Sequence, residues 1–208
     1  MSLRCLGVGI ATVDVVFDVA DYPAENAEVR AAALQQTRGG NVTNTLVALQ
    51  QWGNACAWAG MLCPGPGAEL VLADLQRVGV DTRWCCWADS GTLPTSVVLR
   101  SAASASRTIV HYRDLPELSA EAFAAIDLDA FDWIHFEGRH VPALGAMLRR
   151  VRAHGGPRCS LEVEKPRPAI ETLFDLPDLL LFSRAYAEQQ GFATAPELLA
   201  ARAAHTPA

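Results

Sequence analysis

The stretch TRGGNVTNTLVALQQWG, from Thr37 to Gly53, decides how the rest of the chain is interpreted. It places two glycines and two asparagines at the beginning of an otherwise ordinary apolar helix, which is expected to end at Gly53. Glycines allow the backbone to approach a ligand closely, and asparagine amides offer both hydrogen-bond donors and acceptors. This combination suits a ligand with several hydroxyl groups.

The beginning of this helix is therefore the first candidate binding site. Asn41 and Asn44 are three residues apart, so they share one helix face, and the free N–H groups of the first turn add donors. Capping of the helix by Asn41 or Thr43 alone would need only one such residue. Because the stretch has more polar groups and glycines than a cap requires, we expect Gly39, Gly40, Asn41 and Asn44 to bind a ligand.

Composition restricts the class of partner. With 208 residues, half of them hydrophobic, the chain is long enough for one main domain. A formal net charge of −6 argues against nucleic acid and anionic membrane surfaces as partners. No run spans a membrane, and Asp14 and Asp18 interrupt the apolar N-terminal stretch, which therefore does not resemble a signal peptide. We expect a cytoplasmic protein.

The six cysteines give no sign of a metal site. None forms a CxxC pair, and adjacent Cys85 and Cys86 would point to opposite faces of a strand. Buried free thiols are expected, and the alternative of a zinc site lacks the necessary spacing.

Apolar segments alternate between the strand and helix patterns along the chain. Strands are expected at residues 5–19, 56–62, 131–138, 158–165 and 178–183, and helices at 39–53, 67–80, 119–128, 141–155 and 185–192. The β-branched segments TSVVLRS and SRTIVHYRD interrupt this order and indicate an antiparallel hairpin. The pattern predicts a parallel α/β sheet, and such sheets bind ligands at the carboxyl ends of their strands.

Further polar residues fall in these strand regions. Asp14 lies within an apolar segment, either as a ligand contact that accepts from two sugar hydroxyls or at an exposed edge. The polar sequence from Glu137 to Arg139 also lies at a strand end. Arg107 in the hairpin either reaches a phosphate or is a solvated surface residue.

Another strand end carries the charged residues Glu162, Glu164 and Lys165. These side chains either organise a metal-bound nucleotide or form a surface ion pair. The chain has no GxxxxGK[ST], GxGxxG or GxSxG motif, so a P-loop, a dinucleotide fingerprint and a hydrolase elbow are not indicated.

Five segments taken in order carry a family resemblance: GVGIATVDVVFDVADYP, RGGNVTNTLVALQQWG, SRTIVHYRDLPELSAEAF, WIHFEGR and SLEVEKPR. As a set they resemble the ribokinase-like sugar kinases of the PfkB family over essentially the whole chain. The resemblance implies a three-layer αβα fold with a mostly parallel sheet and a small β-sheet lid, or clasp. The lid would come from about residues 15–37 and 93–113 of a C-terminally truncated domain spanning 1–208, and two lids would pack into a homodimer.

The resemblance also implies roles for particular residues. Asp14, Gly40, Asn41 and Asn44 match positions that hold the sugar hydroxyls, with Gly39 beside them. Arg107 matches the lid arginine near the reacting groups and is the expected catalytic residue. Asn26 stands where ketose-phosphorylating members carry an aspartate that contacts the sugar, so this chain departs from the pattern there.

The implied cofactors are ATP and Mg²⁺, with the nucleotide phosphates near Glu162, Glu164, Lys165 and Arg184. Two departures weaken the catalytic part of the resemblance. Residues 183–186 do not form the N-x-x-E motif of many members, and the GAGD motif, whose aspartate is the base and whose glycine amides stabilise the transferring phosphate, does not occur.

We therefore expect a kinase that transfers the γ-phosphate of ATP to a hydroxyl of a ketohexose such as fructose, with this chain alone inactive. The alternatives are a sugar-binding or regulatory module without catalysis and a fragment without function.

Overall fold

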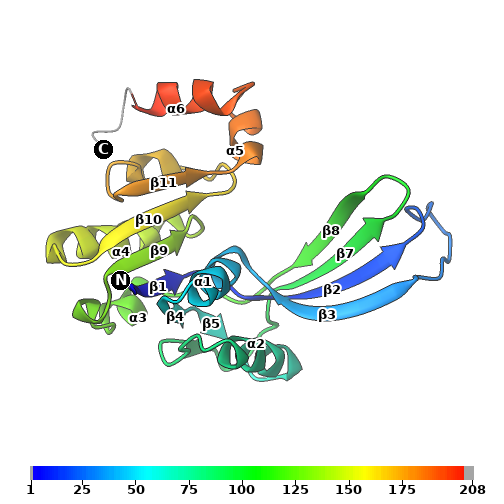
Figure 1. Cartoon of the computed structure of the whole chain (residues 1–208), viewed down its shortest axis with the longest axis horizontal. Helices are drawn as coiled ribbons and strands as arrows, with labels where there is room; N and C mark the ends of the chain where they lie inside the picture. Colours follow the sequence, from blue (N-terminus) through cyan, green and yellow to red (C-terminus); the bar gives the residue numbers. More distant parts are fainter. Residues whose placement is uncertain (1, 204–208) are drawn as a thin grey trace.

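The central sheet is parallel throughout. In the computed structural model, which describes residues 2–203, its strands are ordered β11-β10-β9-β1-β4, and every neighbouring pair is parallel (Figure 1). The strands are β1 (Arg4–Val8), β4 (Ala55–Ala59), β9 (Trp133–Glu137), β10 (Arg158–Val163) and β11 (Leu179–Phe182). The predicted α/β class and parallel sheet are confirmed.

Helices cover both faces of this sheet. The longer ones are α1 (Asn41–Gln51), α2 (Pro66–Arg77) and α4 (Val141–His154), and the shorter ones are α3 (Ala120–Ala124), α5 (Arg184–Gln189), α6 (Ala195–Ala203), η1 (Leu128–Ala130) and η2 (Ile170–Leu173). Alternate residues of β1 belong to different cores, as the period of two in a strand requires. Leu6 packs with the α3 and α4 residues, whereas Cys5 packs with α1 and α2. The result is three layers.

A second, smaller sheet extends away from the central one (Figure 1). Its order is β3-β2-β7-β8, with β2 (Thr12–Val19), β3 (Ala33–Gly39), β7 (Thr95–Ser101) and β8 (Ser106–Tyr112). The predicted hairpin is present as antiparallel β7 and β8, while β2 and β7 run parallel. The short strands β5 (Met61–Leu62) and β6 (Cys86–Trp87) pair separately.

The prediction of one strand from residue 5 to residue 19 is wrong, because the chain leaves the central sheet after Val8 and enters the small sheet at Thr12. The backbone N–H of Ile10 donates to the Glu137 carboxylate at 2.9 Å instead of to a strand neighbour. At Gly9, a Cβ atom would lie 2.5 Å from the same carboxylate, so only glycine fits without a shift. The break connects the two sheets.

Candidate functional site

One face of the small sheet and the carboxyl ends of the central strands border a pocket of about 830 Å³. It brings together seven residues singled out from the sequence: Asp14, Gly40, Asn41, Asn44, Arg107, Glu164 and Lys165. Residues from four separate parts of the chain thus meet in one place, at the end of the sheet where α/β folds bind ligands.

Strand register places the small-sheet residues on this face. Asp14 of β2 pairs with Ser96 of β7, which pairs with His111 of β8, and all three line the pocket. Two residues further along β2, the pocket-lining set is Val16, Val98 and Ile109. Since alternate residues of a strand share a face, Asp14 is an inward-facing residue of this sheet rather than an exposed edge residue.

The glycines leave space for this carboxylate and for the beginning of α1. A Cβ atom on Gly39 would lie 2.2 Å from Oδ2 of Asp14, so the glycine allows the observed position of Asp14. Oδ1 of the same carboxylate accepts a hydrogen bond from Thr12 at 2.9 Å. Gly40 has a φ of +106°, which disfavours other residues, and a Cβ there would lie 2.5 Å from the carbonyl oxygen of Ile10.

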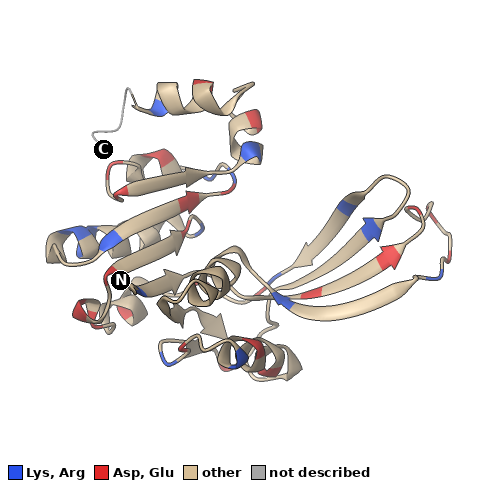
Figure 2. Ribbon diagram, in the orientation of Figure 1, with Lys and Arg blue, Asp and Glu red and all other residues tan. Residues whose placement is uncertain are grey.

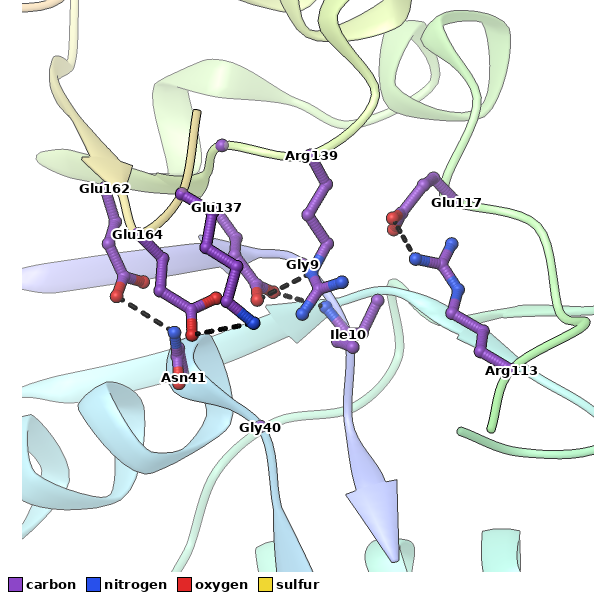
Figure 3. Close-up of polar contacts among 12 residues, drawn as sticks. Gly9, Ile10, Gly40, Asn41, Arg113, Glu117, Glu137, Arg139, Glu162 and Glu164 are labelled. Atoms are coloured by element: carbon purple, nitrogen blue, oxygen red, sulfur yellow. Dashed lines mark hydrogen bonds and ion pairs between the residues drawn. The ribbon is translucent and has the colours of Figure 1, made fainter. Parts of the chain in front are cut away.

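The two asparagines are each held by one charged side chain. Nδ2 of Asn41 donates to Oε1 of Glu162 on β10 at 3.0 Å (Figure 3). Oδ1 of Asn44 accepts from Arg38 on β3 at 2.8 Å. Each amide therefore has one end fixed by the protein and the other end directed away from that partner.

A second glutamate organises the junction between the sheets. Glu137 at the end of β9 is buried, accepts from the Ile10 backbone, and pairs with Arg139 at 2.7 Å (Figure 3). Burial raises the pKa of Glu137, and the Arg139 guanidinium opposes that rise. Arg139 itself lines the pocket.

Glu162 lies close to two other glutamates, Glu137 and Glu164. Burial, followed by the charges of Glu137 and Glu164, raises the pKa of Glu162 to about 7. Its Oε2 atom is buried and has no hydrogen-bond partner among the described residues, which suits a carboxyl group that holds a proton. The Glu164 carboxylate lies 3.7 Å from the Lys165 ammonium, and both residues line the pocket.

The pocket is cationic, although the chain has a net charge of −6. Six of its lining residues are Arg or Lys and two are Asp or Glu: Arg100, Arg107, Arg113, Arg139, Arg167 and Lys165 against Asp14 and Glu164. Burial and the nearby charges of Arg139, Arg113 and Lys165 lower the pKa of His111 in the same pocket. Figure 2 shows residues of both signs on the small sheet, where Arg100 is paired with Asp18 at 2.6 Å.

Four predicted residues lie elsewhere. None of them lines the pocket, but Gly39 contacts Asp14 and Glu162 contacts Asn41 from behind it. Asn26 and Arg184 lie further away. Asn26 has a φ of +61° and lies between β2 and β3 at the far end of the small sheet. Arg184 is 92% exposed in its side chain and pairs with Glu188. The sequence-based reasoning missed the pocket residues Ser96, Arg100, His111, Arg113 and Arg167. For Ser96, Arg100 and His111, the alternation of residues along β7 and β8 offered a signal, whereas Arg113 and Arg167 lie outside the strands.

Metal ligands are sparse in this region. Residues 2–203 contain no group of three His, Cys, Asp or Glu side chains arranged to hold a metal ion. All six cysteines are free, and within the same range no helix has the length and apolar character needed to cross a membrane.

Comparison with known proteins places the chain in a class of enzymes. The model of the pfkB family of carbohydrate kinases matches residues 3–206, and the chain belongs to this family, whose members are ATP-dependent sugar kinases. Ketohexokinase of Mus musculus is 35% identical over 204 residues, which cover 94% of this chain and 68% of that protein.

Solved structures support the same fold. A putative ribokinase from Agrobacterium tumefaciens superposes with a TM-score of 0.80 at 22% identity, covering 99% of this chain and 69% of that one. Arabidopsis thaliana ribokinase complexed with ribose and ATP gives a TM-score of 0.77 at 16% identity, covering 98% and 68%. The expected ribokinase-like fold is confirmed.

Proposed function

We propose that this chain supplies the sugar-binding part of a kinase that transfers the γ-phosphate of ATP to a hydroxyl of a ketohexose such as fructose. The observation that carries the proposal is the grouping of Asp14, Asn41 and Asn44 in one pocket with six cationic side chains. A carboxylate and two amides suit adjacent hydroxyl groups, and guanidinium and ammonium groups suit phosphate oxygens. The similarity to ketohexokinase supports a ketose as the acceptor.

Arg107 is the proposed catalytic residue. It lines the pocket from β8, and its side chain makes no ion pair or hydrogen bond with residues 2–203, so its guanidinium is available to a ligand. Its neighbour in register, Arg100, is instead held by Asp18. Positive charge beside a moving phosphoryl group stabilises the transition state, which is the main contribution of a protein to phosphoryl transfer.

ATP and Mg²⁺ are the proposed cofactors. Lys165 and Glu164 are the residues from the predicted nucleotide set that line the pocket. Mg²⁺ usually combines one or two carboxylates with substrate phosphates and water, and the described residues contain no ready-made set of three ligands. We propose that the ion enters with the nucleotide. Arg184, which does not line the pocket, takes no part in binding the nucleotide.

We propose that this 208-residue chain alone does not catalyse transfer. It has no GAGD sequence, and no aspartate other than Asp14 lines the pocket as defined by the described residues. Without a base and an anion hole, positioning of the sugar gives little acceleration.

A homodimer through the small sheet is a further part of the proposal. On the face opposite the pocket, its strands expose the apolar side chains of Leu34, Val97, Val110 and Tyr112, each at least 38% accessible. Exposed apolar patches of this kind favour association.

The experiment is calorimetric titration of the chain with fructose, followed by a coupled ADP-release assay with ATP and Mg²⁺. Fructose binding without turnover is expected, and Asn41→Ala should weaken binding at least tenfold, from the loss of one or two hydrogen bonds. Arg83→Gln, which removes an exposed ion pair with Asp81 outside the pocket, is the matched control. Equal fructose affinity in wild type and Asn41→Ala would refute the site, and turnover by this chain would refute its inactivity.

A further inference from the structure

Arg38 occupies an unusual position next to the glycine pair. It is the penultimate residue of β3, and only 7% of its side chain is exposed. Its Nε atom donates to Oδ2 of Asp74 on α2 at 2.7 Å. One terminal nitrogen donates to Thr43 at 3.0 Å and to Asn44 at 2.8 Å, both on α1. The guanidinium thus connects β3, α1 and α2 immediately behind the pocket.

The chemistry of the guanidinium fixes the orientation of the Asn44 amide. Arginine has donors and no acceptor, so the atom of Asn44 that faces it must be the carbonyl oxygen. The NH₂ group of Asn44 then points away from Arg38, and Asn44 lines the pocket. Asn44 therefore offers a donor to a ligand.

Asn41 has the opposite orientation. Its NH₂ group donates to Glu162, an acceptor, so its carbonyl oxygen is the end that remains for a ligand. Two residues of the same type, three positions apart on one helix, therefore present opposite hydrogen-bond polarity to the pocket.

We propose that Arg38 is a positioning residue that, together with Glu162, sets the polarity of sugar recognition. Asn44 donates to one ligand oxygen, and Asn41 accepts from a hydroxyl. This inference rests on the proposed sugar-binding function. Asp74 is part of the device because it holds the other edge of the guanidinium, and it is shared with Arg77, whose side chain is 72% exposed.

The shared partner provides a matched pair of variants. Arg38→Gln removes an ion pair to Asp74 together with the contact to Asn44, whereas Arg77→Gln removes an ion pair to the same Asp74 and leaves Asn44 untouched. We expect Arg38→Gln to weaken fructose binding at least fivefold, as for the loss of one well-aligned hydrogen bond. Arg77→Gln should leave fructose affinity unchanged. Arg38→Lys, which keeps a positively charged donor nitrogen, should restore part of the loss. Equal affinity in the two Gln variants would refute the role of Arg38.

A measurement without sugar separates this inference from the proposed function. In the unliganded chain, the ¹⁵N resonance of the Asn44 side-chain amide should shift in Arg38→Gln and stay in place in Arg77→Gln. An unchanged resonance in both variants refutes the orientation by Arg38 whatever the ligand. If the resonance shifts while fructose does not bind even to the wild type, the proposed function fails and the orientation stands.

Fluorinated sugars test the polarity itself, also where Arg38→Gln does not fold. Fluorine can accept a weak hydrogen bond but cannot donate one, so replacing the hydroxyl that meets Asn44 should be tolerated by the wild type. The Asn44→Asp variant keeps an oxygen for Arg38 and turns the other carboxylate oxygen toward the ligand. Among monodeoxyfluoro-fructoses, one position should therefore lose at least fivefold more affinity in Asn44→Asp than in wild type. The same loss at every position in both proteins would refute the polarity.

Discussion

The substitution Gly39→Ala tests how tightly the glycine pair is coupled to the carboxylate of Asp14, the proposed sugar contact. The new Cβ atom would lie 2.2 Å from Oδ2 of Asp14 and 2.4 Å from Oγ1 of Thr12. The backbone of Gly39 is paired in register with Thr12, so the sheet holds the methyl group in place. Gly39 does not have a positive φ, and the substitution adds no backbone strain of that kind. The side chains of Asp14 and Thr12 must therefore move, and Asp14 is the one proposed to contact the sugar.

The expected magnitude follows from what Asp14 loses. A hydrogen bond to an ionised group contributes about 1.5–3 kcal/mol, since charge assistance roughly doubles its strength. Displacing the carboxylate from the hydroxyl that it binds should thus weaken fructose affinity about 10- to 150-fold. In an Asp14→Ala background the same glycine substitution should have no further effect on binding, because the group that it displaces is already absent.

Fructose titration of the four proteins of this cycle is the assay, with thermal unfolding recorded for each. Gly53→Ala is the control: Gly53 has a φ of +87°, and no atom lies within 4 Å of the position that the new methyl group would take, so the substitution strains the backbone at a distance from the pocket. It should lower stability by about 1 kcal/mol and leave fructose affinity unchanged. If Gly39→Ala binds fructose within twofold of wild type, the steric argument fails.

Three other predictions concern the site and its support. Since the pKa of Glu162 is raised to about 7, native-state stability should fall as pH rises from 4.5 through 7. Urea unfolding should therefore show Glu162→Gln more stable than wild type by about 1–2 kcal/mol at pH 8 and equally stable at pH 4. Burial lowers the pKa of His135 to about 4, so wild-type stability should fall as pH drops from 6.5 toward 4, and His135→Gln should flatten that slope in the same assay. In the active kinase of which this chain is proposed to supply the sugar-binding part, Arg107→Ala should reduce kcat about 10²- to 10³-fold with less than a threefold change in fructose affinity. An unchanged kcat would remove Arg107 from the catalytic role.

Local patterns predicted the central sheet and helix α1 well. The alternation of apolar periods gave the parallel strands, and the segment from Thr37 to Gly53 gave helix α1 with its glycine turn. These features depend on residues that are close together in sequence, which is why they can be read without the fold.

Nonlocal pairing explains what the sequence did not reveal. The break after Val8 depends on Glu137, which is 127 residues from Ile10. The parallel pairing of β2 with β7 brings Ser96 beside Asp14, and no local pattern reports that register. The hydrogen bond of Glu162 with Asn41, 121 residues away, was likewise not predicted, and its place near a nucleotide stays a prediction.

Two buried glutamates lie directly behind the pocket of this acidic protein. Glu137 and Glu162 lie at the ends of adjacent strands, and each directs its carboxylate toward a residue that lines the pocket, Arg139 and Asn41 respectively. The charge of Glu137 is balanced by Arg139, and Glu162 favours its protonated form, so neither adds a full negative charge at the pocket surface. The two acids therefore stand behind the proposed ligand contacts, and the side chains that line the pocket in front of them include more cations than carboxylates.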